Sequence, residues 1–337
     1  MVECGRVESG RVSALTPAAR LLGIRCAIAI PLIVAISAGI FAVASLSPFD
    51  PLAAYLGSNY QFATPSQREA MRQAYDTTQP WYEAWWHWMG GLLRGDLGWS
   101  STQSQSVATV LAERMPFTLA LSGAALLSAT AVAILLGCVA GMRRGGVVDR
   151  LCTGFSVTFA AVPPFVVSLA LVMAVAVGLR WLPVSGASAP GAEYTVEGVV
   201  RHAVLPWSAL TLSMVPWLLL TTRAAVVESV DSDAVRGARS RGTYGLALLR
   251  GHIAPVSVLP TLALLGTRLP ELIAGAAIVE TVFGWPGMAA VLVDSAAALD
   301  FALLAALTVG AAAAVLAGSA LSDAAAVALD PRVRIAA

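Results

Sequence analysis

The chain carries few side chains that could do chemistry. All 21 of its basic residues are Arg, and the sequence contains no Lys. A Walker-A phosphate loop uses a Lys to reach the β- and γ-phosphates, and pyridoxal or Schiff-base enzymes use a Lys amine. Both classes of enzyme are therefore excluded. The four Cys and three His have no metal-ligand spacing, so we predict no catalytic residue and no metal site.

Three charged residues lie within an otherwise apolar segment, from about residue 253 to 283. They are Arg268, Glu271 and Glu280. Ionisable residues inside a membrane span mark transport paths, so we take these three as a candidate translocation path. Arg268 and Glu271 are three positions apart and share a helix face, so they can pair. Two interpretations stay open, a pair that lines a pore and a purely structural tie.

The strongest local pattern is in the polar stretch 223–252. Its segment Asp233–Gly242 reads DAVRGARSRG and predicts a short helix closed by Gly242, because glycine adopts the left-handed conformation that ends a helix. A second short helical segment follows. An Arg-bearing helical hairpin is typical of a docking element for a soluble partner. The alternative is an ordinary basic loop beside a membrane.

Membrane helices must position these residues. The chain is 58% hydrophobic and 12% charged, whereas about a quarter of a soluble domain is charged. The net charge of +1 argues against a nucleic-acid partner. A bilayer span takes about 20 residues, so we predict an all-α integral membrane protein with six spans. These are 26–49, 115–142, 151–179, 202–222, about 253–283, and 301–322.

The distribution of Arg predicts the orientation of the spans. Fourteen Arg lie in the tail 1–25, the second and fourth loops and the tail 323–337, against six in the other loops. Positive residues favour the cytoplasmic side, so both termini are expected there. The first span has 24 charge-free residues, longer than the roughly 7–15 of a cleaved signal peptide. We therefore expect it to stay in the membrane.

The first outer loop, 50–114, is long and rich in Trp. Trp81, Trp85 and Trp88 have the spacing of one helical face. This favours an amphipathic helix at the membrane interface, where Trp is enriched. A platform for an extracytoplasmic partner is the second interpretation, and the two are compatible.

Beyond these residue patterns, Asp233–Gly242 resembles the "EAA" loop of ATP-binding-cassette importer permeases, in the form of the dipeptide/oligopeptide/nickel branch. Further matches follow in chain order from about residue 20 to 334. They are Gly95–Ser100, Leu182-Pro183 with Gly186, Glu280–Gly287 and Leu329–Arg334. Three positions depart from the family pattern. They are Phe49 in the turn 48–51, Gly251 before His252, and Ala302 after Asp300 and an aromatic residue.

The resemblance is closest to the first permease of the branch, the dipeptide permease B type. It implies the type I ABC importer permease fold, with its core at 115–322. It implies coupling to ATPases through a loop whose matching residues are Asp233, Ala234, Arg236, Ala238, Arg239 and Gly242. The implied partners are a paralogous second permease, two cytoplasmic ABC ATPase subunits and an extracytoplasmic solute-binding protein. ATP and Mg would be bound by the ATPases, and this chain would bind no cofactor. The implied location is a bacterial cytoplasmic membrane.

The implied function is import of di- or oligopeptides. The same class of importer carrying nickel chelates or another small solute is the alternative. A self-sufficient secondary transporter or channel is a remote one, because a proton relay would need more unpaired carboxylates in the spans.

Overall fold

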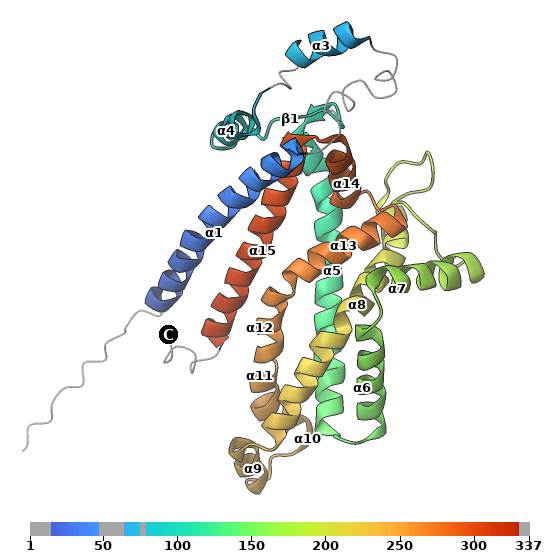
Figure 1. Ribbon diagram of the computed structural model, residues 1–337. Coiled ribbons are helices and arrows are strands. Elements are labelled where there is room, and N and C mark those ends of the chain that lie inside the picture. The colour runs from blue at the N-terminus through green and yellow to red at the C-terminus, as the bar shows by residue number, and fades with distance from the viewer. Residues whose placement is uncertain (1–14, 47–63, 75–78, 330–337) are drawn as a thin grey trace, which may run out of the picture.

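The computed structural model describes residues 15–46, 64–74 and 79–329, and this part of the chain is almost entirely helical (Figure 1). The first half contains α1 (Leu15–Ser45), α3 (Pro65–Ala74), α4 (Trp81–Leu92), α5 (Val107–Met142), α6 (Val147–Ala160), α7 (Pro164–Leu171) and the π-helix η2 (Val172–Gly178). The second half contains α8 (Val196–Val230), α9 (Asp233–Ser240), α10 (Gly245–Leu248), the π-helix η3 (Leu249–Ile253), α11 (Ala254–Ser257), α12 (Leu259–Thr267), α13 (Leu269–Phe283), α14 (Met288–Ala298) and α15 (Phe301–Leu329). Two short strands, β1 (Trp99–Ser100) and β2 (Gln105–Ser106), pair antiparallel.

Long apolar helices confirm the predicted membrane fold. Four helical runs are long and apolar enough to cross a bilayer, namely α5, α8, the run Gly245–Thr267 and Phe301–Ala320 of α15. Two bent pairs of helices raise the number of candidate spans to as many as six, and α1 adds a shorter apolar stretch, Ala27–Val43. The helices α1 and α5 begin earlier than predicted, at Leu15 and Val107. An apolar run marks the part of a helix that needs lipid, and the helix itself continues until its backbone pattern is broken.

The third predicted span is not one continuous helix. Its two parts, α6 with α7 and η2, meet at 106°. Pro163 and Pro164 cause the break, because proline has no N–H and its ring clashes with the preceding turn. The apolar run 151–179 showed the length of this span and not its bend.

The fifth predicted span is also broken. Its helix changes from η3 to α11 and α12, and α13 begins after Arg268 with Pro270 in its first turn. Gly284 has φ +54 and ends α13, and α14 then continues at 90° to α13. Prolines and glycines in this segment therefore set the direction of each piece.

The helices α5 and α8 pack very closely. A Cβ on Gly137 would lie 2.7 Å from the Cβ of Thr222, and one on Gly141 would lie 2.6 Å from Cγ1 of Val226. Small residues four apart allow the backbones of membrane helices to approach in this way. This pair of glycines fixes the half of α8 that leads into α9.

The loops gather at two opposite ends of the molecule. In Figure 1, α4, β1 and α14 lie at the upper end, whereas α9 and α10 lie at the lower end. The start of α1 and the end of α15 point toward the lower end as well. That both tails share one side of the membrane with the loop 223–252 stays a prediction. The tails 1–14 and 330–337, the turn 48–51 and most of the match Leu329–Arg334 lie outside the described residues.

Candidate coupling surface and translocation site

The predicted loop helix is α9, and both of its ends are closed by specific hydrogen bonds. The Ser232 side chain accepts a hydrogen bond from the backbone N–H of Val235 at 3.4 Å. At the other end, Gly242 N–H donates to Arg239 O at 2.9 Å and Thr243 N–H donates to Ala238 O at 3.1 Å. This is the Schellman pattern, in which the residue after the cap is left-handed. Gly242 has φ +85, which confirms the prediction that it ends the helix.

One face of α9 is anchored and the other is free. Val235 and Ala238 are buried, and they pack in a cluster with residues of α5, α8, α10 and η3. The other members of this cluster, which we call the anchor cluster, are Cys138, Val226, Leu248 and Ile253. The exposed face carries the predicted coupling residues Asp233, Ala234, Arg236 and Arg239. Ala238 therefore holds the helix to the spans, and the other four are placed to meet a partner.

The ion pair within α9 contributes little to its stability. Asp233 and Arg236 pair across one turn, and both side chains are largely exposed. Exposed pairs of this kind contribute about 0–1 kcal/mol. The position of α9 therefore depends on its buried face and its two closed ends.

A second ion pair, which sequence reasoning missed, lies at the same end of the molecule. Asp149 at the start of α6 accepts two hydrogen bonds from Arg223 of α8, that from Nη2 at 2.9 Å. The backbone N–H of Gly145 donates to the same carboxylate at 2.8 Å. The Asp149 side chain is only 5% exposed. This pair ties the α5–α6 turn to α8 seven residues before its end at Val230. Its partners are 74 residues apart and share no motif.

The predicted pair at the start of α13 is present. Arg268 and Glu271 form an ion pair, and their side chains are 28% and 53% exposed. The Arg268 guanidinium also lies 4.6 Å from the ring centre of Trp217 on α8, within the range of cation–π attraction. The pairing is therefore confirmed, and its role in transport stays a prediction.

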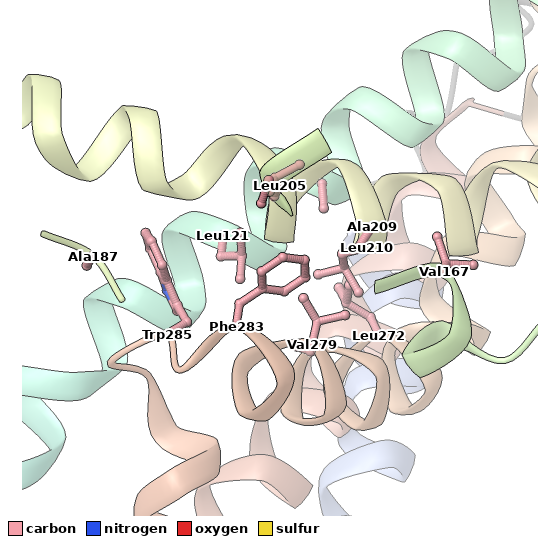
Figure 2. Close-up of a cluster of buried hydrophobic side chains, with 13 residues drawn as sticks. Leu121, Val167, Ala187, Leu205, Ala209, Leu210, Leu272, Val279, Phe283 and Trp285 are labelled. Carbon is pink, nitrogen blue, oxygen red and sulfur yellow. The ribbon is translucent and has the colours of Figure 1, made fainter. Parts of the chain in front are cut away.

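A cavity of about 200 Å³ opens beside this pair. It lies where the bend between α6 and α7 faces α8 and α13. Its lining includes Val162 and Pro163 at the bend, Ser213 and Trp217 on α8, and Glu271 on α13. Beside it, a buried apolar cluster joins α5, α7, α8 and α13; Figure 2 shows Val279 and Phe283 of α13 turned toward its other members. This cluster holds the broken helices in place around the cavity.

Glu280 occupies a different site from Arg268 and Glu271. It lies nine residues further along α13 than Glu271, or about 13 Å at 1.5 Å per residue. Its side chain is buried, with 2% of the residue exposed. The carboxylate accepts hydrogen bonds from Thr118 Oγ1 at 2.5 Å and from Ala289 N–H at 2.9 Å. Any side chain on Gly287 would collide with it. Its geometry is that of a tie between α5 and the α13–α14 turn, and the path role predicted for it stays untested.

The Trp-rich helix α4 has the predicted face, and two of its three Trp are turned toward protein, whereas Trp81 is exposed. Trp88 is buried and donates to Leu97 O at 3.3 Å, and Trp85 donates to Ser37 Oγ of α1 at 3.0 Å. Tyr82 and Trp86 on the other side are exposed. Two Trp of the predicted face thus fix α4 on the other helices, and the exposed aromatics remain for an interface.

A buried carboxylate that the sequence did not single out fixes the adjoining hairpin. Asp300, just before α15, accepts hydrogen bonds from Ser100 Oγ at 2.7 Å and from the N–H and Oγ1 of Thr102 at 3.1 and 2.9 Å. It also accepts from Leu303 N–H in the first turn of α15 at 3.3 Å. Asp300 therefore ties the β1–β2 hairpin to the start of the last span.

The described part of the chain shows no cluster of three or more His, Cys, Asp or Glu that could hold a metal. Cys138 and Cys152 are buried free thiols. They pack among apolar neighbours in different clusters.

Comparison with known proteins agrees with this architecture. The family model described as binding-protein-dependent transport system inner membrane component matches residues 133–335. The oligopeptide transport system permease protein AppB of Bacillus subtilis is 28% identical over 92% of this chain and 97% of its own length. The dipeptide transport system permease protein DppB of Lactococcus lactis is 28% identical, covering 81% and 87%. The glutathione transport system permease protein GsiC of Escherichia coli is 28% identical, covering 85% and 87%. The family model spans more than half of the sequence, and the chain belongs to the family of binding-protein-dependent transport system inner membrane components.

Proposed function

We propose that this chain is a permease subunit of an ATP-driven importer that carries di- or oligopeptides across the bacterial cytoplasmic membrane. The observation that carries the proposal is α9, a closed helix with a buried anchor face and an exposed charged face. Family membership supports it. The names of the relatives favour peptides over the alternative, a nickel chelate or another small solute.

The proposal includes partners outside this chain. Two ATPase subunits lie in the cytoplasm and hold ATP and Mg, and one of them receives the exposed face of α9 in a cleft, so this chain itself is not an enzyme. A paralogous permease completes the membrane path, and a solute-binding protein delivers substrate to the opposite end. Both tails lie in the cytoplasm. The Arg count on the predicted inside segments supports this orientation.

The mechanism follows from how α9 is attached. ATP binding closes the ATPase dimer and moves α9 with it. The anchor cluster, the Asp149–Arg223 pair and the close α5–α8 contact connect α9 to α5, α6, α8 and the run that begins at α10. A displacement of α9 is therefore transmitted to those spans, because packed interfaces move as units. Substrate and ATP each bind the two conformational states of the transporter with different affinities, so each shifts the equilibrium between those states.

The translocation path passes the cavity beside Arg268 and Glu271. Charges in the hydrocarbon cost about 2.5–3.5 kcal/mol each on insertion scales. The partly exposed Arg268–Glu271 pair is therefore expected to face water or a polar surface rather than lipid. Broken helices near the membrane midplane are where transporters commonly bind substrate. The break between α6 and α7 lines this cavity, and α13 contributes Glu271 from its first turn. Glu280 acts in this account as a structural tie beside the path.

Charge reversal on α9 tests the function. In the reconstituted complex, Arg239→Glu is expected to weaken ATPase binding and lower import, since close charged pairs at interfaces couple by about 1.5 kcal/mol or more. The control is Arg201→Glu, which changes another exposed Arg, near the opposite end of α8. If Arg239→Glu retained its ATPases and imported peptide as well as the control, the docking role of α9 would be refuted.

A further inference from the structure

The cavity beside α13 is lined by one carboxylate and by no basic side chain. Its one carboxylate is Glu271, and Arg268, the ion-pair partner of Glu271, is not part of the lining. Glu271 is more than half exposed although it is paired. Its carboxylate therefore has capacity for a second donor from within the cavity, since an ionised carboxylate offers about four acceptor sites.

The broken end of α6 adds backbone carbonyl groups to the lining of the same cavity. Pro163 and Pro164 have no N–H, so the carbonyl of Ala160 loses its helical donor four residues ahead. The last carbonyls of a helix carry a partial negative charge that favours cations. Ala160 and Ala161 both line the cavity, as Glu271 does.

An aromatic face completes this environment. Trp217 lines the cavity and holds the guanidinium of Arg268 at 4.6 Å from its ring centre. Indole rings are the strongest side-chain partners in cation–π contacts. The Arg268 side chain thus already uses the two groups, carboxylate and indole, that a mobile cation would seek here.

We infer that this cavity binds the α-ammonium group of a peptide in transit. The ammonium group replaces Arg268 as the ion-pair partner of Glu271. The inference rests on the proposed function, that this pair lines the path. The volume of about 200 Å³ is below the roughly 300 Å³ at which pockets for whole drug-sized ligands begin, so it admits one end of a peptide. Arg268, released from Glu271, is then free to attract a carboxylate of the same substrate.

The experiment compares two peptides in the complete transporter, reconstituted with its partner permease, ATPases and binding protein. Tri-alanine and N-acetyl-tri-alanine differ in the α-ammonium group, and neither has a charged side chain. Each is supplied at a concentration that saturates the binding protein, measured separately, and initial import rates are recorded. The variants are Glu271→Gln and the control Glu193→Gln, an exposed carboxylate in the loop before α8.

Wild-type transporter and the Glu193→Gln control are expected to import the free peptide faster than the acetylated one. Glu271→Gln is expected to lower import of the free peptide on the order of tenfold, the value of one hydrogen bond to a charged group, and to leave the acetylated peptide within about twofold. Glu271→Asp keeps the charge and is expected to keep the preference for the free peptide, which separates recognition from assembly.

Four outcomes would overturn the inference. Equal import of both peptides by the wild-type transporter, or loss of that preference in Glu271→Asp with the complex intact, removes ammonium recognition. If Glu271→Gln slows import of both peptides equally, Glu271 lies on the path but does not recognise the peptide terminus. If Glu271→Gln imports both peptides like wild type, the proposed path itself is wrong at this site.

Discussion

At the scale of single residues, conformation and burial decide which positions matter. Gly242 and Asp149 are both at the end of the molecule that holds α9. One contributes through its backbone conformation and the other through its charge. Gly242 is needed for its positive φ, whereas Asp149 is needed for its buried charge. A matched control in the same region is available for each.

Replacing Gly242 by Val is expected to destabilise the end of α9. A Cβ at Gly242 or at Gly251 would meet no atom within 4 Å, but only Gly242 has a positive φ. A left-handed residue with a side chain costs about 1–2 kcal/mol, and β-branched residues suffer most. Hydrogen exchange of α9 should be faster in Gly242→Val, and import should fall with it. Equal exchange in Gly242→Val and Gly251→Val would show that left-handed geometry is not required.

Replacing Asp149 by Asn is expected to lower the thermal stability of the purified complex. The change leaves Arg223 without its counter-charge in a largely buried position, which costs roughly 3 kcal/mol when a buried pair is broken. The control is Asp233→Asn in the exposed pair, where the expected change is within about 1 kcal/mol. Equal melting temperatures for the two variants would mean that the Asp149–Arg223 pair does not fix the α5–α6 turn.

At the scale of helices, the contact between α5 and α8 is the firmest joint. Its closeness depends on Gly137 and Gly141, which face Thr222 and Val226. The residues that connect α9 to the spans lie on the same two helices or beside them. We therefore expect this joint to carry motion from the loop to the membrane core.

Adding one methyl group to this joint is expected to disrupt it. In Gly141→Ala, the new Cβ would lie 2.6 Å from Cγ1 of Val226 and 3.0 Å from the Arg223 carbonyl oxygen. Overpacking of this kind costs about 1–3 kcal/mol. Gly123→Ala, on the same helix but with no atom within 4 Å, should leave the melting temperature of the complex unchanged. A Gly141→Ala variant as stable as Gly123→Ala would refute a tight joint.

Sequence patterns predicted helices well and predicted their breaks poorly. Length and hydropathy are sufficient to find α5 and α15, and the glycine signal located the end of α9. The bend of 106° between α6 and α7 was not predicted, although Pro163-Pro164 was a visible signal for it.

The site was predicted in part, because sequence separation conceals contacts. The pair Arg268–Glu271 is local and follows from helical spacing. Asp149–Arg223 joins residues 74 apart, and the hydrogen bond between Ser100 and Asp300 joins residues 200 apart. Nothing in the local pattern around Glu280 distinguishes a carboxylate that faces a cavity from one that is buried against Thr118.

At the scale of the whole molecule, the two ends are built differently. The end with α4 is held by buried Trp side chains and by Asp300, and it presents Tyr82 and Trp86. The end with α9 presents charge on a helix anchored to the spans. The cavity lies between these ends, at the break between α6 and α7 and beside the first half of α13. This is the arrangement expected of a subunit driven from one end and supplied with substrate at the other.

The central claim is that α9 couples ATPase motion to the spans, and one cross-linking measurement tests it most directly. Ala234 is exposed on α9 and can be replaced by Cys in a chain whose own cysteines are substituted. We expect Ala234→Cys to cross-link to a Cys in the ATPase cleft, and the cross-link to stop import until a reductant restores it. A Cys at exposed Ala189, in the loop before α8, should give no such product. If the intact complex gave no cross-link at Ala234 with any cleft position, or imported peptide at full rate while cross-linked, the coupling account would be contradicted.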